Sequence, residues 1–379
     1  MIDVIIPVYK GLAQTRRCVE SVLANAQATA FEIVAVDDAS PEPAIARYLD
    51  ELAAARRITL VRNDKNLGFV QSVNRGMALH PDRDVVLLNS DTEVANDWLD
   101  RLRRAMYAYP DVGTVTPFSN NATICSYPFE GWAAGVPGTL GLAALDGLFA
   151  TTNAARTVDL PTAVGFCMCI RRACLDQVGL FDAPRFGRGY GEENDFCMRA
   201  AGAGWRNVLA GDVFVYHEGA VSFSGERLAL TETAGRMLAE LYPDYLRKVR
   251  EFLRYDPAGT LRAAVDSARI ASNSDELRHV LAERIEERTL MKARLTEAEI
   301  YADEREPLIA KLRRGLALAE TLLSARDAEI ERLRAGLSHA ETLAFERYHE
   351  LQELQKSWLW KYRIYLMRRK ARRAPPPPA

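Results

Sequence analysis

The stretch FEIVAVDD, residues 31–38, is a run of apolar residues that ends in two aspartates. The stretches DVIIPVY, residues 3–9, and DVVLLNSD, residues 84–91, have a similar form. Unbroken runs of Val, Ile and Leu are typical of strands that are buried on both faces, as in parallel sheets. Helical patterns lie between these runs, so strands and helices alternate along the chain. This order predicts an α/β fold with a mostly parallel central sheet.

Composition changes sharply near residue 255 of the 379-residue chain. Nearly all the glycines and short apolar runs come before this point, and Ala, Leu, Glu and Arg dominate after it. We therefore expect a globular domain over residues 1–255, a linker over 256–273, a helical and coiled-coil region over 274–357, and a basic, aromatic and proline-rich tail over 358–379.

Apolar residues recur at heptad spacing from Ile309 to Trp358, and thirteen of the fifteen first and fourth positions are apolar. Such a seam is typical of a coiled coil rather than of a lone surface helix. Pro307 is expected to start or break this helix, and a weaker helix is expected from Asp275 to Ala302. The seam predicts a homo-oligomer, with folding back onto the earlier helix as the alternative. The seam positions are Ile309, Leu312, Leu316, Ala319, Leu323, Arg326, Ile330, Leu333, Leu337, Ala340, Ala344, Arg347, Leu351, Leu354 and Trp358.

Charge and targeting signals exclude several classes of protein. The 49 basic and 51 acidic residues nearly cancel, so no nucleic-acid partner is expected. The start MIDVIIPVYK lacks the basic and long apolar regions of a signal peptide, and no run is long enough for a transmembrane helix. The six cysteines form no CxxC pair and suit reduced thiols. These features predict a cytoplasmic protein.

The tail interleaves aromatic and basic residues in WLWKYRIYLMRRKARR, residues 358–373. Aromatic rings favour the lipid headgroup boundary, and basic residues favour anionic membrane surfaces. The tail therefore predicts peripheral contact with the inner face of the cytoplasmic membrane. The alternative is a frayed, solvated helix end followed by a disordered proline run.

The predicted strand ends carry carboxylates instead of a phosphate-binding loop. Neither GxGxxG nor GxxxxGK[ST] follows the first strand. Asp37 and Asp38 follow one strand, and Asp91 and Glu93 follow another. Carboxylate oxygens suit a divalent cation, or hydrogen bonds to the base and ribose of a nucleotide. Capping of a helix by Asp38 and Ser40 is the alternative for the first pair.

Two further stretches carry titratable residues. GYGEENDFCMRA places Glu192, Glu193 and Asp195 within four positions, where like charges raise one another's pKa. A solvated helix start tolerates such a cluster, and an active site uses it to supply a general base. His217 follows the apolar run VFVY. A lone histidine there is more often structural, but its place after a strand favours a position in the shared cleft.

Residues 1–235 resemble the family 2 glycosyltransferases, which have the GT-A fold. The matching pieces, in family order, are IIPVYKG, VDDAS, NDKNLGFVQSVNRGM, LLNSDTEV, TPFSNNATICSYP, GFCMCIRR, GLFD, GYGEENDFCMRA and VYHEG. NLGF and NSDTEV are most similar to the rhamnosyl- and galactofuranosyl-transferase branch. The resemblance implies an inverting, metal-dependent transfer of a sugar from a nucleotide-diphosphate donor, dTDP-rhamnose or a UDP-sugar, to a hydroxyl of a bacterial surface polysaccharide or lipid-linked acceptor.

The resemblance also implies site residues. Glu193 occupies the position of the catalytic base, where the family more often has Asp, and the adjacent Glu192 is the alternative for this catalytic role. Asp91 and His217 would hold Mn²⁺ or Mg²⁺, and Asn89 replaces the first Asp of the family's DxD motif. The residues expected to bind donor or acceptor are Pro7, Val8, Tyr9, Asp38, Asn66, Gly68, Asn89, Ser90 and Asp195, of which Asp195 would position the acceptor or cap a helix.

A second hypothesis comes from another functional class. Asn89 and Glu193 depart from the family pattern and favour a catalytically degenerate nucleotide-sugar-binding module on a coiled-coil scaffold. The retained Asp38, Asp91 and His217, together with the complete acidic motif, favour the enzyme. A nucleotidyltransferase is a distant third, because its glycine-rich phosphate loop is missing.

Overall fold

The computed structural model describes residues 1–187, 189–219, 227–300, 302–356 and 358–371. The chain forms two compact units, Met1–Glu287 and Arg288–Ala379. The strands are β1 (Ile2–Val8), β2 (Phe31–Asp37), β3 (Thr59–Arg62), β4 (Asp84–Leu88), β5 (Thr92–Glu93), β6 (Val112–Ser119), β7 (Thr157–Leu160), β8 (Cys167–Ile170) and β9 (Arg206–His217).

The helices up to α11 belong to the first unit, α12 spans the boundary, and α13 and α14 belong to the second. They are α1 (Leu12–Ala24), α2 (Pro43–Ala54), α3 (Phe69–Met77), α4 (Trp98–Met106), α5 (Leu142–Thr152), α6 (Arg172–Val178), α7 (Ala183–Phe186), α8 (Glu192–Gly202), α9 (Arg227–Leu241), α10 (Tyr245–Tyr255), α11 (Gly259–Ser272), α12 (Ser274–Ile300), α13 (Ala302–Lys356) and α14 (Trp358–Ala371), with a short 3₁₀ helix at Thr123–Cys125.

The nine strands form one sheet in the order β3-β2-β1-β4-β8-β6-β9-β5, and β7 pairs with β9. Strands β1 to β4 run in one direction, and β6 and β9 share that direction. Strands β5, β7 and β8 run the opposite way. Six of the nine strands are thus parallel, which confirms the predicted α/β class with a mostly parallel sheet.

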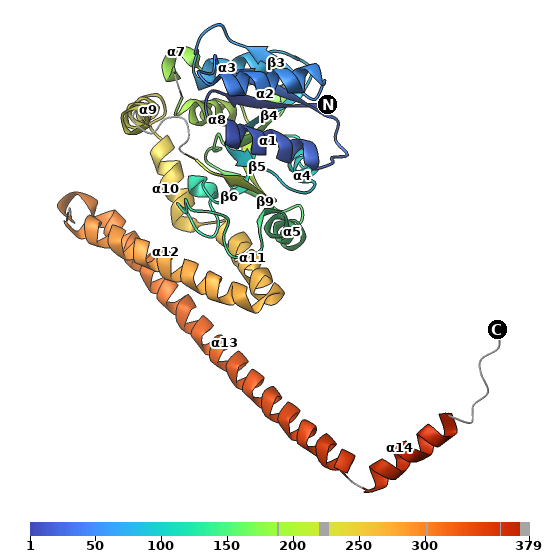
Figure 1. Ribbon diagram of the computed structural model, residues 1–379. Helices are drawn as coiled ribbons and strands as arrows, with labels where there is room; N and C mark the ends of the chain where they lie inside the picture. The colour runs from blue at the N-terminus through green and yellow to red at the C-terminus, as the bar shows by residue number, and fades with distance from the viewer. Residues whose placement is uncertain (188, 220–226, 301, 357, 372–379) are drawn as a thin grey trace. The chain divides into compact units, whose positions relative to one another are not determined.

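Helices cover both faces of this sheet (Figure 1). One core joins α1, α2, α4, α5 and α11 to the sheet and includes Trp98, Phe149 and Leu261. A second core joins the helices α3, α6, α7, α8 and α9 to the sheet. It includes Phe196 of α8 and Leu238 of α9. Helix α8, which carries the acidic motif, therefore lies on the same face as α3.

The predicted linker at residues 256–273 is wrong, because most of it is helix α11. Leu261 and Val265 of α11 are buried in the first core. Their spacing of four residues places them on one helical face, so this helix packs against the domain instead of bridging two parts of the chain. The change in composition near residue 255 marks a switch to helix, and the compact unit continues to Glu287.

In the second unit, α13 is one continuous helix of 55 residues. The predicted helical region is therefore confirmed, but the break at Pro307 is wrong, since α13 begins at Ala302 and continues through Pro307. A proline removes one backbone hydrogen bond from a helix, a local loss that a long helix can sustain. Of the described helices, none combines the length and apolarity needed to span a membrane. Residues 372–379 of the tail lie outside the described residues.

Candidate active site

The carboxyl ends of β1, β2 and β4 bring the predicted nucleotide-binding residues to one edge of the sheet. β1 ends with Pro7 and Val8, and the half-buried Tyr9 follows. Beside it, the Asp38 N–H donates to the Val8 carbonyl oxygen at 2.9 Å. β4 pairs with β1 in parallel on the other side, so Asn89–Asp91 continues at the same edge.

Asp38 is buried, and its carboxylate holds the loop that precedes α3. Oδ1 accepts hydrogen bonds from Asn63 Nδ2 and the Leu67 N–H, both at 2.7 Å, and Oδ2 accepts one from the Gly68 N–H at 2.9 Å. Gly68 has a φ of 85°, which favours glycine. Three of the roughly four acceptor positions of this carboxylate are therefore used within the protein. They position the loop that contains Asn66 and Gly68.

The alternative role for Asp38, capping of the next helix, is wrong. Helix α2 has Glu42 as its N-cap residue. The neighbouring Asp37 accepts hydrogen bonds from the Ser40 N–H at 2.9 Å and from Arg62 Nε at 2.8 Å. Both aspartates thus fix loops at this edge of the sheet.

Asp91 and His217 come together because β5 pairs antiparallel with the end of β9, where Thr92 lies opposite His217. His217 Nε2 is 3.5 Å from Asp91 Oδ1, and each side chain is only 14% exposed. Two ligand atoms that each lie about 2.1 Å from one ion are separated by about 3.0–3.4 Å at bond angles of 90–109°. The pair therefore fits a shared metal ion after a small adjustment.

The imidazole of His217 is oriented by residues that the sequence did not predict. Its Nδ1 lies 2.8 Å from the Asn121 carbonyl oxygen. A carbonyl only accepts, so Nδ1 carries the proton and Nε2 of the neutral ring offers its lone pair toward Asp91. The Asn120 side chain accepts from the His217 N–H at 2.8 Å and donates to its carbonyl oxygen at 2.9 Å. The Phe166 ring stacks on the imidazole at 5.3 Å.

The turn after β4 is also fixed by its backbone. The Asn89 N–H donates to the Phe166 carbonyl oxygen at 2.9 Å, and the Asn89 carbonyl oxygen accepts from Thr92 Oγ1 at 2.7 Å. Asn89, Ser90 and Asp91 are half-buried. One carboxylate and one imidazole form a mixed oxygen and nitrogen donor set, which suits Mn²⁺ better than the oxygen-preferring Mg²⁺.

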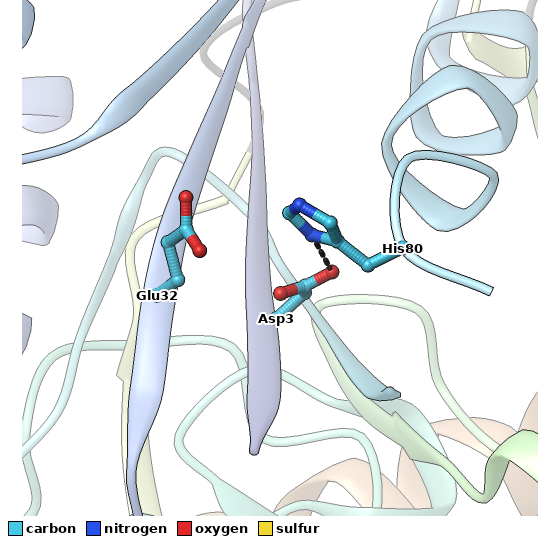
Figure 2. Close-up of side chains that lie close together, drawn as sticks. All are labelled: Asp3, Glu32 and His80. Atoms are coloured by element: carbon cyan, nitrogen blue, oxygen red, sulfur yellow. Dashed lines mark hydrogen bonds and ion pairs between the residues drawn. The ribbon is translucent and has the colours of Figure 1, made fainter. Parts of the chain in front are cut away.

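A second group of possible ligands consists of Asp3, Glu32 and His80, whose ligand atoms lie within 4.8 Å of one another (Figure 2). It lies near the start of β1 and β2, at the edge opposite to the predicted site. Arg83 Nη1 donates to Asp3 at 2.9 Å and to Glu32 at 2.7 Å. The guanidinium already neutralises these carboxylates, so this group functions as an ion-pair network.

The acidic motif begins α8, and Glu192 is buried at its first position. Glu192 is 4% exposed, and its Oε2 has no hydrogen-bond partner among the described residues. Burial, and then the charge of Glu193, raise the pKa of the Glu192 carboxyl well above its usual range. Glu193 is half-buried and accepts from Asn194 Nδ2 at 3.0 Å, and burial raises the pKa of its carboxyl as well. The alternative of a solvated helix start is therefore wrong.

Gly165 and Phe166 connect this motif to the Asp91–His217 pair. A Cβ atom added to Gly165 would lie 3.8–3.9 Å from Cβ, Cγ and Cδ of Glu193, so the glutamate packs directly over this glycine. The ring of the next residue, Phe166, stacks on His217, and its carbonyl oxygen accepts a hydrogen bond from the Asn89 N–H in the turn after β4. The acidic motif and the Asp91–His217 pair therefore border the same two-residue segment.

Asp195 has a different role from the one predicted. Its Oδ2 accepts from Arg199 Nε at 2.8 Å, and its Oδ1 accepts from the Tyr242 hydroxyl at 2.6 Å. Asp195 is 1% exposed, and among the described residues no side chain caps the start of α8. The Tyr245 hydroxyl donates to Asn194 Oδ1 at 2.9 Å. The prediction that Asp195 binds the acceptor or caps α8 is therefore corrected, because this buried side chain anchors the segment after α9 to α8.

The known proteins that are similar to this chain include one curated protein and a large number of solved structures. The curated protein y4gI of Sinorhizobium fredii (strain NBRC 101917 / NGR234), described as uncharacterized, is 26% identical over 235 residues. The match covers 59% of this chain, which spans about a quarter of that relative's length. The crystal structure of GalNAc-T7 with UDP, GalNAc and Mn²⁺ is 18% identical, with a TM-score of 0.48 over 70% of this chain and 54% of that one.

Another similar structure is the mannosyltransferase PcManGT from Pyrobaculum calidifontis, in complex with GDP-Man and Mn²⁺, with 16% identity, a TM-score of 0.47, and coverage of 86% of this chain and 87% of that one. Similarities of this size transfer no residue role. The family comparison is more specific, because residues 3–179 match the model of glycosyl transferase family 2. These residues include β1, β2, β4 and the turn with Asp91, as the sequence resemblance predicts. Residues 3–179, slightly under half of the chain, are therefore similar to glycosyl transferase family 2.

Proposed function

We propose that this chain is an inverting, metal-dependent glycosyltransferase. It moves a sugar from a nucleoside-diphosphate donor to a hydroxyl group of a surface polysaccharide or lipid-linked acceptor. The observation that carries the proposal is the shared border of the acidic motif and the Asp91–His217 pair along Gly165–Phe166. It brings a carboxylate with a raised pKa near a pair of side chains suited to a metal ion.

Glu193 is the proposed general base. As the acceptor oxygen forms its bond to the anomeric carbon, the hydroxyl proton moves to the Glu193 carboxylate, and the bond from that carbon to the diphosphate oxygen breaks. The nucleoside diphosphate leaves with the bonding electron pair. Burial raises the pKa of the Glu193 carboxyl, which makes its carboxylate a better proton acceptor. Glu192 is more deeply buried, and burial together with the charge of Glu193 raises the pKa of its carboxyl well above its usual range, which favours its protonated form and leaves Glu193 as the proposed proton acceptor.

Asp91 and His217 would hold the metal ion, and we propose Mn²⁺ in preference to Mg²⁺ because one ligand is a nitrogen. The ion, when bound, stabilises negative charge on the departing diphosphate. Pro7, Val8 and Tyr9 would line the nucleotide pocket. Asp38 keeps one acceptor position for a donor hydroxyl while it positions the loop with Asn66 and Gly68, and Asn89 and Ser90 would complete the diphosphate side. A dTDP-rhamnose donor is proposed first, and UDP-sugars second.

The proposal is tested by nucleoside diphosphate release from a panel of dTDP-rhamnose, UDP-glucose, UDP-galactose and GDP-mannose, with Mn²⁺ and with excess chelator. We expect release from at least one donor, and its loss with chelator. The competing proposal, a degenerate binding module, predicts that one nucleotide sugar binds and that none is turned over. Asn89 favours that alternative, since a neutral amide binds a cation less strongly than a carboxylate.

We further propose that α13 pairs with α13 of a second copy. In the single chain Leu333 and Leu337 of the heptad seam are 56% and 62% exposed. Burying such leucines against a partner removes apolar surface from water at about 25 cal/mol per Å². The same helix also exposes Leu318 and Leu322, which lie off the seam and serve as internal references for substitution.

The tail is proposed to bind the anionic inner face of the cytoplasmic membrane. Helix α14 exposes Tyr362, Tyr365 and Met367 to 49%, 58% and 55%. Lys361 and Arg363 are exposed beside them. Rings and cations at this spacing suit the headgroup region, where each basic residue contributes about 1 kcal/mol near an anionic surface. This contact would bring the enzyme close to a lipid-linked acceptor.

A further inference from the structure

Helix α11 and the start of α12 contribute a buried charge network to the first unit. Its centre is Arg269, which has no exposed surface. Arg269 Nε donates to Glu276 Oε2 at 2.7 Å, and its two terminal nitrogens donate to the Glu283 carboxylate at 2.7 and 2.8 Å. Glu276 is fully buried and Glu283 is 6% exposed. The three side chains bind the two helices to each other.

The same network holds the segment 119–139, which lies between β6 and α5. Arg269 Nη1 donates to the Tyr127 hydroxyl oxygen at 3.0 Å, and that hydroxyl donates to Asp266 of α11 at 2.8 Å. Further along, the Thr139 N–H and hydroxyl both donate to Glu276 Oε1, at 2.6 and 2.7 Å. The segment is thus attached at two points that are twelve residues apart.

A second arginine of α11 adds hydrogen bonds near Tyr127, the first of the two attachment points. Arg262 is 4% exposed, and its Nε donates to the Ser126 carbonyl oxygen at 2.9 Å. Its Nη2 donates to the Ile124 carbonyl oxygen at 3.3 Å. A Cβ atom on Gly138 would clash with Glu276 Oε2, so the backbone of the segment packs directly against the network.

The held segment is the one that orients His217. The Tyr127 N–H donates to the Ser119 carbonyl oxygen at 2.8 Å and so closes the loop that contains Asn120 and Asn121. These two asparagines bind the backbone of His217 and its Nδ1. A continuous series of hydrogen bonds therefore runs from Arg269 through Tyr127 and the closed loop to the imidazole.

We propose that α11 and α12 form a clamp, centred on Arg269, that fixes segment 119–139 and thereby sets the orientation of His217. This inference rests on the proposed metal-binding role of His217. A buried ionic network is a poor means of stabilising a fold, because apolar side chains of similar volume stabilise it equally well or better. Directed hydrogen bonds instead define where a loop lies, which is what a metal ligand requires of its supporting residues. Arg269 is thus a positioning residue.

The test uses the full chain with Tyr127→Phe and Thr139→Val combined. These changes remove the two hydroxyls through which the segment contacts Arg269, Asp266 and Glu276, without removing a charge or altering the Arg269–glutamate pairs. The Thr139 N–H bond to Glu276 and the Arg262 bonds to the segment remain, so the variant loosens the attachment at both points. Tyr107→Phe is the matched control, because it also removes a hydroxyl that donates to a carboxylate, that of Asp84, at 2.8 Å. Hydrogen exchange of the metal-free proteins reports on residues 119–133 and on the His217 amide, and electron paramagnetic resonance titration reports on Mn²⁺ affinity.

The double variant is expected to exchange faster at residues 119–133 and at the His217 amide, with unchanged exchange in β1 and β2. Its Mn²⁺ dissociation constant should rise about tenfold, the lower end of the effect of losing outer-shell support, and the control should match wild type in both measurements. Unchanged exchange in the folded double variant would overturn the clamp. If the double variant does not fold, Thr139→Val alone is measured in the same way. Absence of Mn²⁺ binding in wild type would overturn the metal proposal, while the exchange data still decide the clamp.

Discussion

Substituting each glutamate of the acidic motif in turn should separate their roles. Glu193→Gln is expected to keep donor binding and lose sugar transfer, because the amide has the same shape but cannot accept a proton. Glu192→Gln is expected to retain most activity. Glu192 is 4% exposed, and burial raises the pKa of its carboxyl well above its usual range, which favours the uncharged acid. Glutamine replaces that form with little change in shape or charge.

The size of the effect follows from the chemistry of the base. General-base catalysis contributes about 10²–10⁴ in rate. At 1.36 kcal/mol for each factor of ten, this corresponds to about 2.7–5.4 kcal/mol of transition-state stabilisation. Glu193→Gln should therefore lower kcat by at least about a hundredfold, whereas Glu192→Gln should change it by much less.

The free energy of unfolding of Glu192→Gln should also depend on pH differently from that of wild type. The folded-state pKa of Glu192 is raised above the value of about 4.3 expected in the unfolded chain. Stability from this group is complete below that unfolded value and is lost as pH rises through the raised folded value, at about 1.4 kcal/mol for each pKa unit. Glu192→Gln cannot ionise, so its stability relative to wild type should increase as pH rises above 4.3.

The assay combines three measurements on the same protein preparations. Nucleoside diphosphate release gives kcat with whichever donor wild type turns over, calorimetric titration of the nucleoside diphosphate with Mn²⁺ gives the dissociation constant, and urea unfolding from pH 4 to pH 8 (range chosen around the glutamate pKa) gives stability. Wild-type turnover by Glu193→Gln together with an inactive Glu192→Gln would refute the assignment and move the base by one residue. Loss of nucleotide binding in Glu193→Gln would show that this side chain binds the donor.

Three other predictions concern the metal, the seam and the tail. Asp91→Ala and His217→Ala should each weaken nucleotide binding in the presence of Mn²⁺ and leave metal-free binding unchanged; equal loss under both conditions would contradict metal ligation. Ile330→Glu, on the heptad seam, should reduce the mass measured by sedimentation toward the monomer value of 42.3 kDa, whereas Leu322→Glu, off the seam, should not; a monomeric wild type would end the oligomer proposal. A chain that ends at Lys356 should lose flotation with anionic liposomes that the full chain retains; equal flotation would leave the tail without a membrane role.

The sequence alone was sufficient for the features that depend on local pattern. Apolar runs between helical segments predicted the parallel strands, since a strand buried on both faces needs a continuous apolar run. The carboxylates after β2 and β4 were predicted to meet because parallel strands end at one edge. The family resemblance predicted that Asp91 and His217 belong to one metal site, and in the structure Asp91 Oδ1 lies 3.5 Å from His217 Nε2. The long helix followed from its heptad spacing, although the effect of Pro307 was overestimated, because one missing hydrogen bond is a local loss.

Only the tertiary structure decided which polar side chains support others. Asn120 contacts His217 across 97 residues of sequence, and Tyr127 contacts Asp266 across 139. No local period encodes such distances. Asp195 has the same charge as Glu193 two positions earlier, but it faces the interior of the domain and is paired there. Burial and partners, which depend on what the rest of the chain packs around each residue, determine whether a carboxylate is held in place by the fold or is poised to accept a proton.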